Sequence, residues 1–537
     1  MNRPCDKPCH VRAPKGNRGL LVEPPPERVA ERIADNIRLR GQRDYDLQGR
    51  RLAAIASRAR TELLGLARRW TVAYRNVPAQ EPNADRPIFL AGHQPQMFHP
   101  GVWLKNFALG SLAARHDATA VNLIVDADVM SDPAITVPTG DAESPEFGEV
   151  PFDRSEPKWP YEDRPIIDRS LLASFAERVK NAVGPLVARP LVDRYWSLVL
   201  ERAKHSENLG ACLAQARHQL EATFLGGAET LEVPQSWLCT GESFPWFVAH
   251  LLAQLPRFGP IYNEAIRDYR RVHRLRSRSH PAPELVQDGA WLETPFWVGT
   301  AESPRRRRLF SRALGDAIAL TDGDGWETQL PLTADGHANR AVERLIELGN
   351  RGVRIRPRAL MTTLWARLVL GDLFIHGVGG AKYDWVTDRL IERFFGLPPP
   401  GFLVVSATLH LPIEHAAGTV AEVAAIDAEL RDITHHPERH IDGRAQSAAA
   451  DLAAAKRRWV AMPQTRANAR QRCQAIREVN AALQPWLADQ RRRLNDGRAE
   501  SLHRTQAERV LDWREYAFCL YPETFLRECL SELLGQL

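Results

Sequence analysis

A group of polar side chains near residue 95 has the composition of an anion-binding or proton-transfer site. It consists of Gly92, His93, Gln94, His99 and Lys105, which follow a short apolar run. A glycine at such a point lets a ligand approach the backbone, and the N–H groups of a following helix attract an anion. We assign His93 and His99 to catalysis by hydrogen bonding or proton transfer, and the other three residues to binding. The alternative is a tight turn with structural histidines.

A pair of carboxylates, Asp126 and Asp128, follows the next apolar run. Two carboxylates at this spacing could bind an amine, ribose hydroxyls or Mg²⁺. A helix cap or a solvated loop explains the same residues equally well. We include both aspartates among the candidate catalytic residues and predict no resident metal ion.

A second glycine-rich segment lies far along the chain. Its sequence is Gly377-Val378-Gly379-Gly380-Ala381-Lys382-Tyr383-Asp384. Three glycines after an apolar run could hold an anion on backbone N–H groups. Lys382 would add positive charge, and Tyr383 and Asp384 would add polar contacts. The spacing of a P-loop is absent, so the segment predicts an anion site without specifying a nucleotide.

Three arginines at alternate positions precede that segment. Arg354, Arg356 and Arg358 would share one face of an extended chain, where guanidinium groups suit a polyanion or several carboxylates. A solvated basic edge is equally consistent with the pattern. We assign Arg356 and Arg358 to substrate binding, and we expect the run Arg305–Arg308 to lie on the solvated surface.

The elements that position these residues follow an α/β pattern. Apolar runs over 87–91 and 120–125 flank a helical stretch over 102–115, which is a βαβ unit and implies parallel strands. The pattern recurs as helix 360–370, strand 373–376, helix 383–395 and strand 402–406. Ligands of such sheets bind outside the carboxyl ends of the strands. We therefore expect both glycine segments to meet at one pocket on that edge.

The predicted fold class is α/β, with a Rossmann-like parallel sheet core, an inserted mixed or helical domain and a C-terminal coiled-coil segment of long helices. The segments are a disordered arm (1–26), an N-terminal helix with the first half of the core (27–160), an inserted mostly helical or mixed region (161–345), the second half of the core (346–413), coiled-coil helices (414–505) and a tail packed on the core (506–537). Within them, the acidic and proline-rich stretch 139–165 predicts a loop.

Composition limits the class of protein. The 537 residues carry a net charge of +5 from 71 basic and 66 acidic residues, an excess too small to indicate nucleic-acid binding. No apolar run approaches the roughly 18 residues of a membrane span, and the polar start Met1–Arg18 does not resemble a secretory signal. The seven cysteines show no disulfide or metal-site spacing, even at Cys5, Cys9 and His10, which favours a cytoplasmic location.

The segment Gly92–Ala113 resembles bacillithiol synthase, the cysteine-adding enzyme of bacillithiol biosynthesis. That family has a Gly-Gln-Gln type loop, a glycine–proline step and a helix with a lysine, and the counterparts here are Gly92-His93-Gln94, Pro100-Gly101 and Lys105. The family's acidic stretch, later glycine loop and Ser-Ala-Thr are similar to Asp126 with Asp128, Gly377–Tyr383 and Ser406-Ala407-Thr408. Lys382 lies in a loop where the family has an acidic residue.

The resemblance implies a Rossmann-like core, an inserted domain and a dimerising coiled coil over Glu414–Glu500. It also implies a small-molecule ligase or transferase that joins an amino acid or thiol such as cysteine to an aminosugar-type acceptor. The cofactor stays undetermined, and a nucleotide such as ADP or ATP would fit. We expect an anionic small-molecule substrate, a homodimer formed through the coiled-coil helices, and neither nucleic acid nor membrane as a partner. The alternative is a non-catalytic binding or assembly protein whose helical arm contacts a partner.

Overall fold

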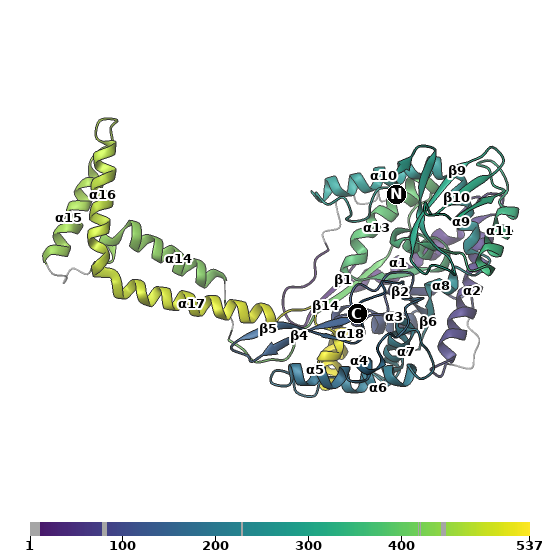
Figure 1. The fold of residues 1–537 in the computed structure, drawn as a ribbon, viewed down its shortest axis with the longest axis horizontal. Helices are drawn as coiled ribbons and strands as arrows, with labels where there is room; N and C mark the ends of the chain where they lie inside the picture. Colours follow the sequence, from purple (N-terminus) through teal and green to yellow (C-terminus); the bar gives the residue numbers. More distant parts are fainter. Residues whose placement is uncertain (1–10, 78–82, 227–228, 417, 419, 442–446) are drawn as a thin grey trace.

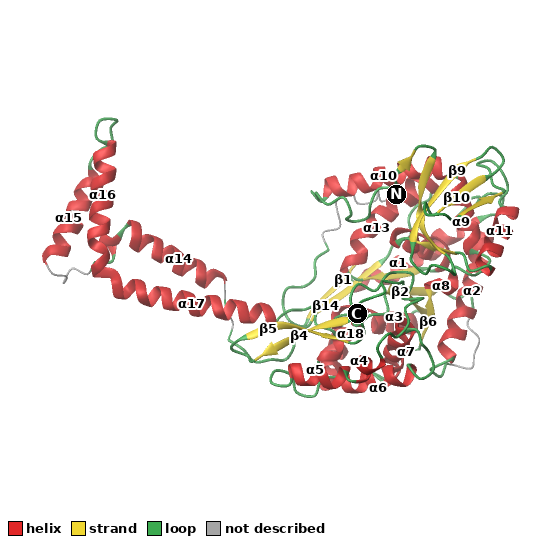
Figure 2. Ribbon diagram, in the orientation of Figure 1, coloured by secondary structure: helices red, strands yellow, loops and turns green. Residues whose placement is uncertain are grey.

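The computed structural model describes residues 11–77, 83–226, 229–416, 418, 420–441 and 447–537 (Figures 1 and 2). The chain is a mixed α/β protein that contains a sheet with parallel strands, and this much of the predicted fold class is confirmed. Cys5, Cys9 and His10 lie outside the described residues. None of the described helices is both long and apolar enough to cross a membrane.

A six-stranded sheet forms the centre of the molecule. Its strands in spatial order are β1 (Gly19–Glu23), β14 (Leu403–Thr408), β13 (Leu373–His376), β2 (Ile88–His93), β3 (Thr119–Ile124) and β6 (Thr230–Pro234). The strands from β14 to β6 run parallel, whereas β1 pairs antiparallel with β14. The parallel strands therefore end at one common edge.

Strand β1 corrects the prediction of a disordered arm over residues 1–26. Leu20 pairs with Ala407 and Leu21 with Ser406, so residues 19–23 add an edge strand to the sheet. The strand is only partly buried and follows a segment rich in proline, glycine and charge. Its stability comes from a partner at the other end of the chain, which local composition does not indicate.

Alternate residues of the central strands face two separate hydrophobic cores. Ile88 and Leu90 of β2 belong to one core, and Phe89 and Ala91 belong to the other. A strand covered on both faces needs a continuous apolar run rather than an alternating one. This requirement explains why the run at 88–91 indicates a strand, and Figure 2 shows helices on both sides of the sheet.

Helices cover the two faces in two groups. The first core contains residues of α2 (Leu52–Val72), α8 (Gln235–Leu238), α9 (Phe244–Ala253), α10 (Leu255–Val272), α11 (Asn339–Asn350), α12 (Ala359–Trp365), α13 (Val378–Leu390) and the π turns Ala366–Leu370 and Ile391–Phe395. The second core contains residues of α1 (Val29–Gly41), α3 (Pro100–Arg115), α4 (Arg169–Ala173), α5 (Phe175–Val183), α6 (Val192–Arg202), α7 (Leu209–Ala222), α18 (Glu523–Gly535) and the 3-10 turn Phe518–Leu520. A further 3-10 turn, Pro26–Arg28, precedes α1.

A second sheet lies beside the first core and is antiparallel. Its strands in order are β11 (Glu327–Leu330), β10 (Ile318–Thr321), β9 (Arg307–Ala313), β8 (Trp291–Gly299) and β12 (Arg354–Pro357), and β7 (Gln287–Asp288) also pairs with β8. The sequence places β12 in the second half of the core, but Ile355 pairs with Val298 of the inserted region. This pairing brings the arginine-rich segment beside Trp297.

A hairpin of β4 (Ala134–Gly140) and β5 (Pro145–Pro151) replaces part of the loop predicted over 139–165. Ile135 and Val137 are buried in the second core. The carboxylate of Asp141 closes the turn because it accepts hydrogen bonds from the backbone of residues 143 and 144. The sequence does not predict β5, because its prolines and the acidic turn before it are typical of a loop.

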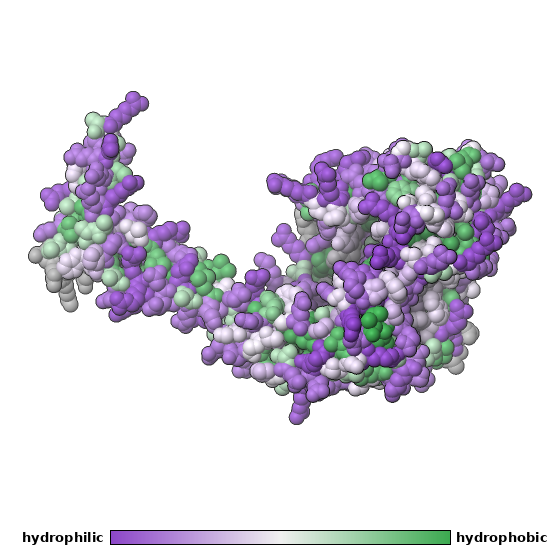
Figure 3. Space-filling model, in the orientation of Figure 1, coloured by the Kyte–Doolittle hydropathy of each residue, from purple (hydrophilic) through white to green (hydrophobic). Residues whose placement is uncertain are grey.

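Four helices form an arm that projects from the body (Figure 1). They are α14 (Val420–His435), α15 (Ser447–Ala461), α16 (Ala469–Leu483) and α17 (Ala488–Leu511), with 3-10 turns at Pro437–Arg439 and Gln484–Leu487. Helix α14 lies beside α17, and α15 lies beside α16. Breaks between the helices fall at Pro437, Pro463 and Pro485, as predicted. The visible face of the arm is mostly hydrophilic (Figure 3).

Candidate functional site

A cavity of about 760 Å³ opens at the carboxyl ends of β2, β3 and β13. The segment after β2 lines one part of it, and the first turn of α13 lines another, so the structure brings the two glycine segments together. The predicted site residues that line the cavity are Gly92, His93, Gln94, His99, Lys105, Asp128, Arg358, Gly377, Gly379, Gly380 and Tyr383. The predicted site residues outside its lining are Asp126, Arg356, Lys382 and Asp384.

His93 at the end of β2 is a neutral imidazole. Burial and the nearby charge of Lys105 lower the pKa of His93 to about 3. Its Nδ1 donates a hydrogen bond to the carbonyl oxygen of Gln94 at 3.1 Å, and a carbonyl can only accept. Nε2 therefore carries a lone pair that can accept a hydrogen bond or a proton.

His99 has a structural contact at each ring nitrogen. Its Nδ1 accepts a hydrogen bond from Gly101 N at 3.1 Å and caps α3, while Nε2 lies 3.4 Å from Glu515. Burial and Arg514 lower the pKa of His99 to about 3. Gly101 itself must be glycine, because a Cβ there would lie 1.9 Å from the Ala407 carbonyl oxygen. These contacts favour the structural alternative for His99.

Lys105 is a buried ammonium group beneath the first glycine segment. Its Nζ donates to the Gly92 carbonyl oxygen at 2.6 Å. Burial and the charge of Arg217 lower the pKa of Lys105 to about 7. Lys105 can therefore be either charged or neutral near neutral pH, and it can respond to an anion in the cavity.

Only one of the two predicted aspartates faces the cavity. Asp128 accepts a hydrogen bond from Gln94 Nε2 at 3.0 Å and forms an ion pair with Arg306 at 2.7 Å. Asp126 instead accepts hydrogen bonds from the backbone N–H and hydroxyl of Ser236, and burial together with Glu162 raises its pKa to about 7. The chain turns after β3, so the pair does not share a ligand face as predicted.

The second glycine segment is the start of a helix rather than a loop. Helix α13 begins at Val378, with Gly377 as an N-cap residue that makes no side-chain capping bond and with no acidic residue in the first turn. The first N–H groups of a helix have no intrahelical acceptor. Gly379 and Gly380 of this turn line the cavity, so the turn presents a partial positive charge to it.

Lys382 and Tyr383 lie on different sides of α13. The side chain of Tyr383 lines the cavity, whereas Lys382 is exposed and does not line it. The sequence places the helix start at residue 383, and the true start at 378 rotates Lys382 to the outside. The structure therefore does not bring Lys382 to the cavity with the other residues of its segment.

Asp384 is buried and does not reach the cavity, which corrects its assignment to ligand binding. Its Oδ2 accepts hydrogen bonds from His376 Nε2 at 2.5 Å and from Arg367 Nη1 at 2.9 Å. Burial alone would raise the pKa of Asp384, but its interactions with His376 and Arg367 outweigh burial and hold it below its usual range. His376, which lines the cavity, was not among the predicted site residues.

The alternate arginines bind different carboxylates. Arg354 pairs with Asp163, Arg356 pairs with Glu162 at 2.8 Å outside the cavity, and Arg358 pairs with Glu293 at 2.7 Å. The structure places Arg356 outside the cavity lining, with its guanidinium group paired to Glu162. The solvated-edge alternative is wrong, because all three side chains are largely buried.

Arg358 is the arginine that faces the cavity. Its side chain is 8% exposed, and its Nε and Nη1 are buried with no hydrogen-bond partner among the described residues. Its guanidinium group lies 4.2 Å from the centre of the Trp297 ring. Buried donors without partners are costly, so a ligand that accepts hydrogen bonds from Arg358 would be stabilised.

Sequence reasoning missed several residues that line the cavity. They are His376, Trp297, Arg306, Arg514 and Glu515. His376 ends an apolar strand directly before the glycine segment, which is a usable signal. Arg306 belongs to the run predicted to be solvated surface, yet it pairs with Asp128. Arg514 and Glu515 come from the end of the chain, and no local pattern connects them to the cavity.

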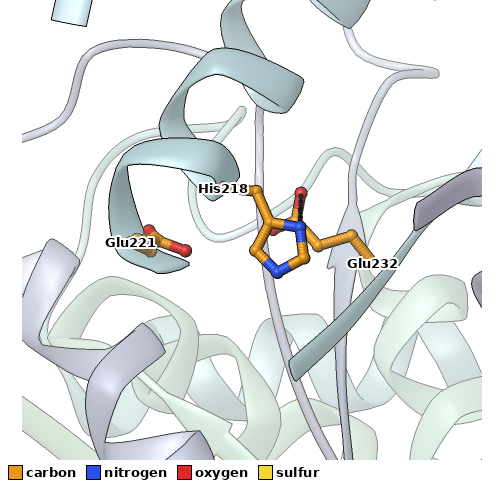
Figure 4. A group of neighbouring side chains, drawn as sticks. All are labelled: His218, Glu221 and Glu232. Atoms are coloured by element: carbon orange, nitrogen blue, oxygen red, sulfur yellow. Dashed lines mark ion pairs between the residues drawn. The ribbon is translucent and has the colours of Figure 1, made fainter. Parts of the chain in front are cut away.

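A separate group of titratable side chains has the spacing of a metal site. His218 and Glu221 of α7 and Glu232 of β6 place ligand atoms within 4.8 Å of one another (Figure 4). Arg217 already supplies a cation, since it donates to Glu221 at 2.7 Å and to Glu232 at 2.5 Å. The Nδ1 of His218 contacts the Tyr74 hydroxyl at 2.7 Å. None of the three residues lines the cavity, so the group is an internal ionic network.

No protein-family model matches this chain, and no curated protein matches it either. The residues around the cavity therefore carry the functional inference. They combine a helix N-terminus, a buried arginine with donors that lack a partner among the described residues, a buried lysine and the histidines His93, His99 and His376.

Proposed function

We propose that this protein is an enzyme that acts on an anionic small molecule in the cavity at the edge of the central sheet. The observation that carries the proposal is that both glycine segments line one cavity of about 760 Å³. Small-molecule sites are typically about 300–1,000 Å³ and lie at the carboxyl ends of parallel strands. The reaction class we propose is a ligase or transferase of the bacillithiol synthase kind, built on a Rossmann-like core.

We place the anionic group of the ligand at the first turn of α13. The N–H groups of this turn lack a capping side chain, and glycines at 377 and 379 leave open space, since a Cβ at either position would meet nothing within 4 Å. Arg358 lines the same cavity, and its buried Nε and Nη1 have no hydrogen-bond partner among the described residues. Phosphate or carboxylate oxygens would satisfy both sets of donors, and ADP or ATP would supply them.

The other substrate groups belong near the end of β2. His93 offers a neutral ring nitrogen, Lys105 offers a donor whose charge depends on pH, and Asp128 offers a carboxylate. This combination suits an amine or thiol next to an acidic group, as in an amino acid such as cysteine, together with a hydroxyl-rich acceptor of the aminosugar type. Joining the two is the reaction that we propose.

The arm favours a second function in the same chain. Helices α14 to α17 project from the body and pack as antiparallel neighbours (Figure 1). Trp486, in the turn Gln484–Leu487, and Leu502, in α17, are large exposed apolar residues of the arm. We propose that the arm is a coiled coil that contacts a partner chain, with a second copy as the first candidate. If the protein binds no small molecule and acts only through the arm, it is a non-catalytic assembly protein, which is the alternative that the sequence leaves open.

Calorimetry distinguishes these functions. ADP, ATP, cysteine and an aminosugar are titrated into the wild type, Arg358→Gln and Lys382→Ala. Each variant removes one positive charge, but of the two residues only Arg358 lines the cavity. Lys382→Ala therefore controls for the loss of charge, and circular dichroism shows whether Arg358→Gln stays folded without its ion pair to Glu293. We expect Arg358→Gln to weaken nucleotide binding by about tenfold or more, the effect of one charged hydrogen bond of about 1.5 kcal/mol. No binding to the wild type, or equal effects of the two variants, would contradict the proposal.

A further inference from the structure

His376 is the last residue of β13 and lies at the wall of the cavity. Its Nε2 lies 2.5 Å from Asp384 Oδ2. Asp384 is fully buried, and it also pairs with Arg367, whose side chain is 2% exposed. Arg367, Asp384 and His376 form a continuous series of ionic and hydrogen-bonded contacts from the interior of the protein to the wall of the cavity.

The partners of His376 determine where its proton lies. Arg367 remains protonated at any physiological pH, and it holds Asp384 as a carboxylate. An ionised carboxylate can only accept hydrogen bonds, so Nε2 of His376 must carry the hydrogen between them. In the neutral ring the lone pair is then on Nδ1.

Nδ1 of His376 is directed at the first turn of α13. A Cβ on Gly380 would lie 2.6 Å from this atom, so the residue at 380 has to be glycine for the helix to approach the ring. Among the described residues, Nδ1 has no hydrogen-bond partner, whereas Nε2 has Asp384. The free nitrogen therefore lies beside the turn to which we assign the anion.

The ring of His376 is held in place on its faces and edges by apolar contacts. Phe374 packs against it with ring centres 4.4 Å apart, and Phe402 meets it edge-on at 5.1 Å. Such contacts fix the ring orientation without occupying its nitrogens. A fixed imidazole with one nitrogen bound to a buried carboxylate and the other free is the arrangement that general-base catalysis requires.

We propose that His376 accepts the proton of the nucleophile in this cavity, with Asp384 and Arg367 as positioning residues. The inference rests on the proposed function and names a residue role within it. The proton of a thiol S–H or an ammonium N–H moves to Nδ1, and the electron pair of that bond stays on sulfur or nitrogen. The imidazolium that forms is stabilised by the carboxylate of Asp384. The freed lone pair faces an electrophile bound at the first turn of α13.

Nuclear magnetic resonance on the full-length protein tests the arrangement directly. Histidine side chains are labelled with a nitrogen isotope, and His376→Gln identifies the signal. We expect the Nε2–H form in the wild type and in Asp384→Asn, which keeps an acceptor oxygen. Asp384→Ala removes the acceptor and should release the ring to a mixture of both forms. An Nδ1–H form in the wild type, or no change in Asp384→Ala, would overturn the proposal.

Turnover and binding separate this inference from the function on which it rests. In an assay with cysteine, an aminosugar and ATP, His376→Gln should lower kcat by roughly 10²- to 10⁴-fold and leave ADP binding intact. A loss of less than about tenfold, below the usual contribution of a general base, would overturn the role of His376 alone. A wild type that binds no ADP but keeps the Nε2–H form would defeat the proposed function alone.

Discussion

Two clusters of buried charged side chains, one around Arg217 and one around Arg367, lie on opposite sides of the central sheet. They differ in their relation to the cavity. In the group around Arg217, the guanidinium links Glu221 and Glu232, and His218 is enclosed by Tyr74 and Thr230. In the group around Arg367, the guanidinium holds Asp384, and Asp384 holds His376. Only the second group includes a side chain that lines the cavity.

The difference shows that buried charge alone does not indicate a site of chemistry. An ion pair enclosed on all sides contributes to the fold, because removing one partner leaves a buried charge without compensation. A group with one unpaired atom at a cavity can still exchange a proton or bind a ligand. Spacing suggests a metal site at His218, but the partners of its neighbours argue for a structural role.

Removing Arg217 should have the largest effect. Arg217→Met leaves Glu221 and Glu232 buried without a cation, so we expect a loss of about 3–5 kcal/mol in the free energy of unfolding, measured by denaturant titration. Arg51→Met is the control, because its ion pair with Asp44 is exposed and should contribute less than about 1 kcal/mol. Equal effects would mean that the network does not stabilise the fold. Zn²⁺ should leave the wild-type unfolding temperature unchanged.

A pair of glycine substitutions in α13 should give a smaller effect. Gly380→Ala places a Cβ against His376, which we expect to cost roughly 1–3 kcal/mol by overpacking and to displace the ring from Asp384. Gly379→Ala meets nothing within 4 Å and should stabilise the helix by up to about 1 kcal/mol. Thermal unfolding measures both. Similar results for the two variants would show that His376 is not held as described.

Anion binding should depend on pH through Lys105, with the smallest effect of the three. Because the pKa of Lys105 is lowered to about 7, the side chain is charged below that pH and neutral above it. We expect affinity for sulfate, which does not itself titrate in this range, to fall by about tenfold as pH rises through 7, the loss of about 1.5 kcal/mol for a charged hydrogen bond. Calorimetry from acidic to alkaline pH measures it.

Lys105→Met provides the control for that dependence. It should bind sulfate weakly at every pH and lose the part of the pH dependence that comes from Lys105, because a methionine side chain carries no charge. A slope that persists in Lys105→Met would assign the titration to another group. His93 and His99, whose pKa values are lowered to about 3, stay neutral throughout the range.

The sequence predicts the backbone of the site better than its side chains. The strands at 88–93, 119–124, 373–376 and 403–408 are continuous apolar runs, because both faces of the sheet are covered. Once these strands are parallel, the turns after them must meet at one edge. The location of the cavity therefore follows from local patterns.

The partners of the charged residues could not be predicted in the same way. The start of α13 lies five residues before the predicted start, and this shift alone moves Lys382 to the outside. Asp384 contacts His376 because the packing of α13 on the sheet brings it to the end of β13, which depends on tertiary structure. Strand β1 joins the sheet from near the start of the chain, and Glu515 lines the cavity from near its end, so no local signal identifies these partners.

A crystal structure of the protein with ADP tests the central claim most directly. We predict phosphate oxygens within hydrogen-bond distance of the first-turn N–H groups of α13 and of Arg358, inside the cavity at the edge of the sheet. Phosphates bound elsewhere on the protein, or a cavity that stays free of nucleotide at saturating ADP, would contradict it.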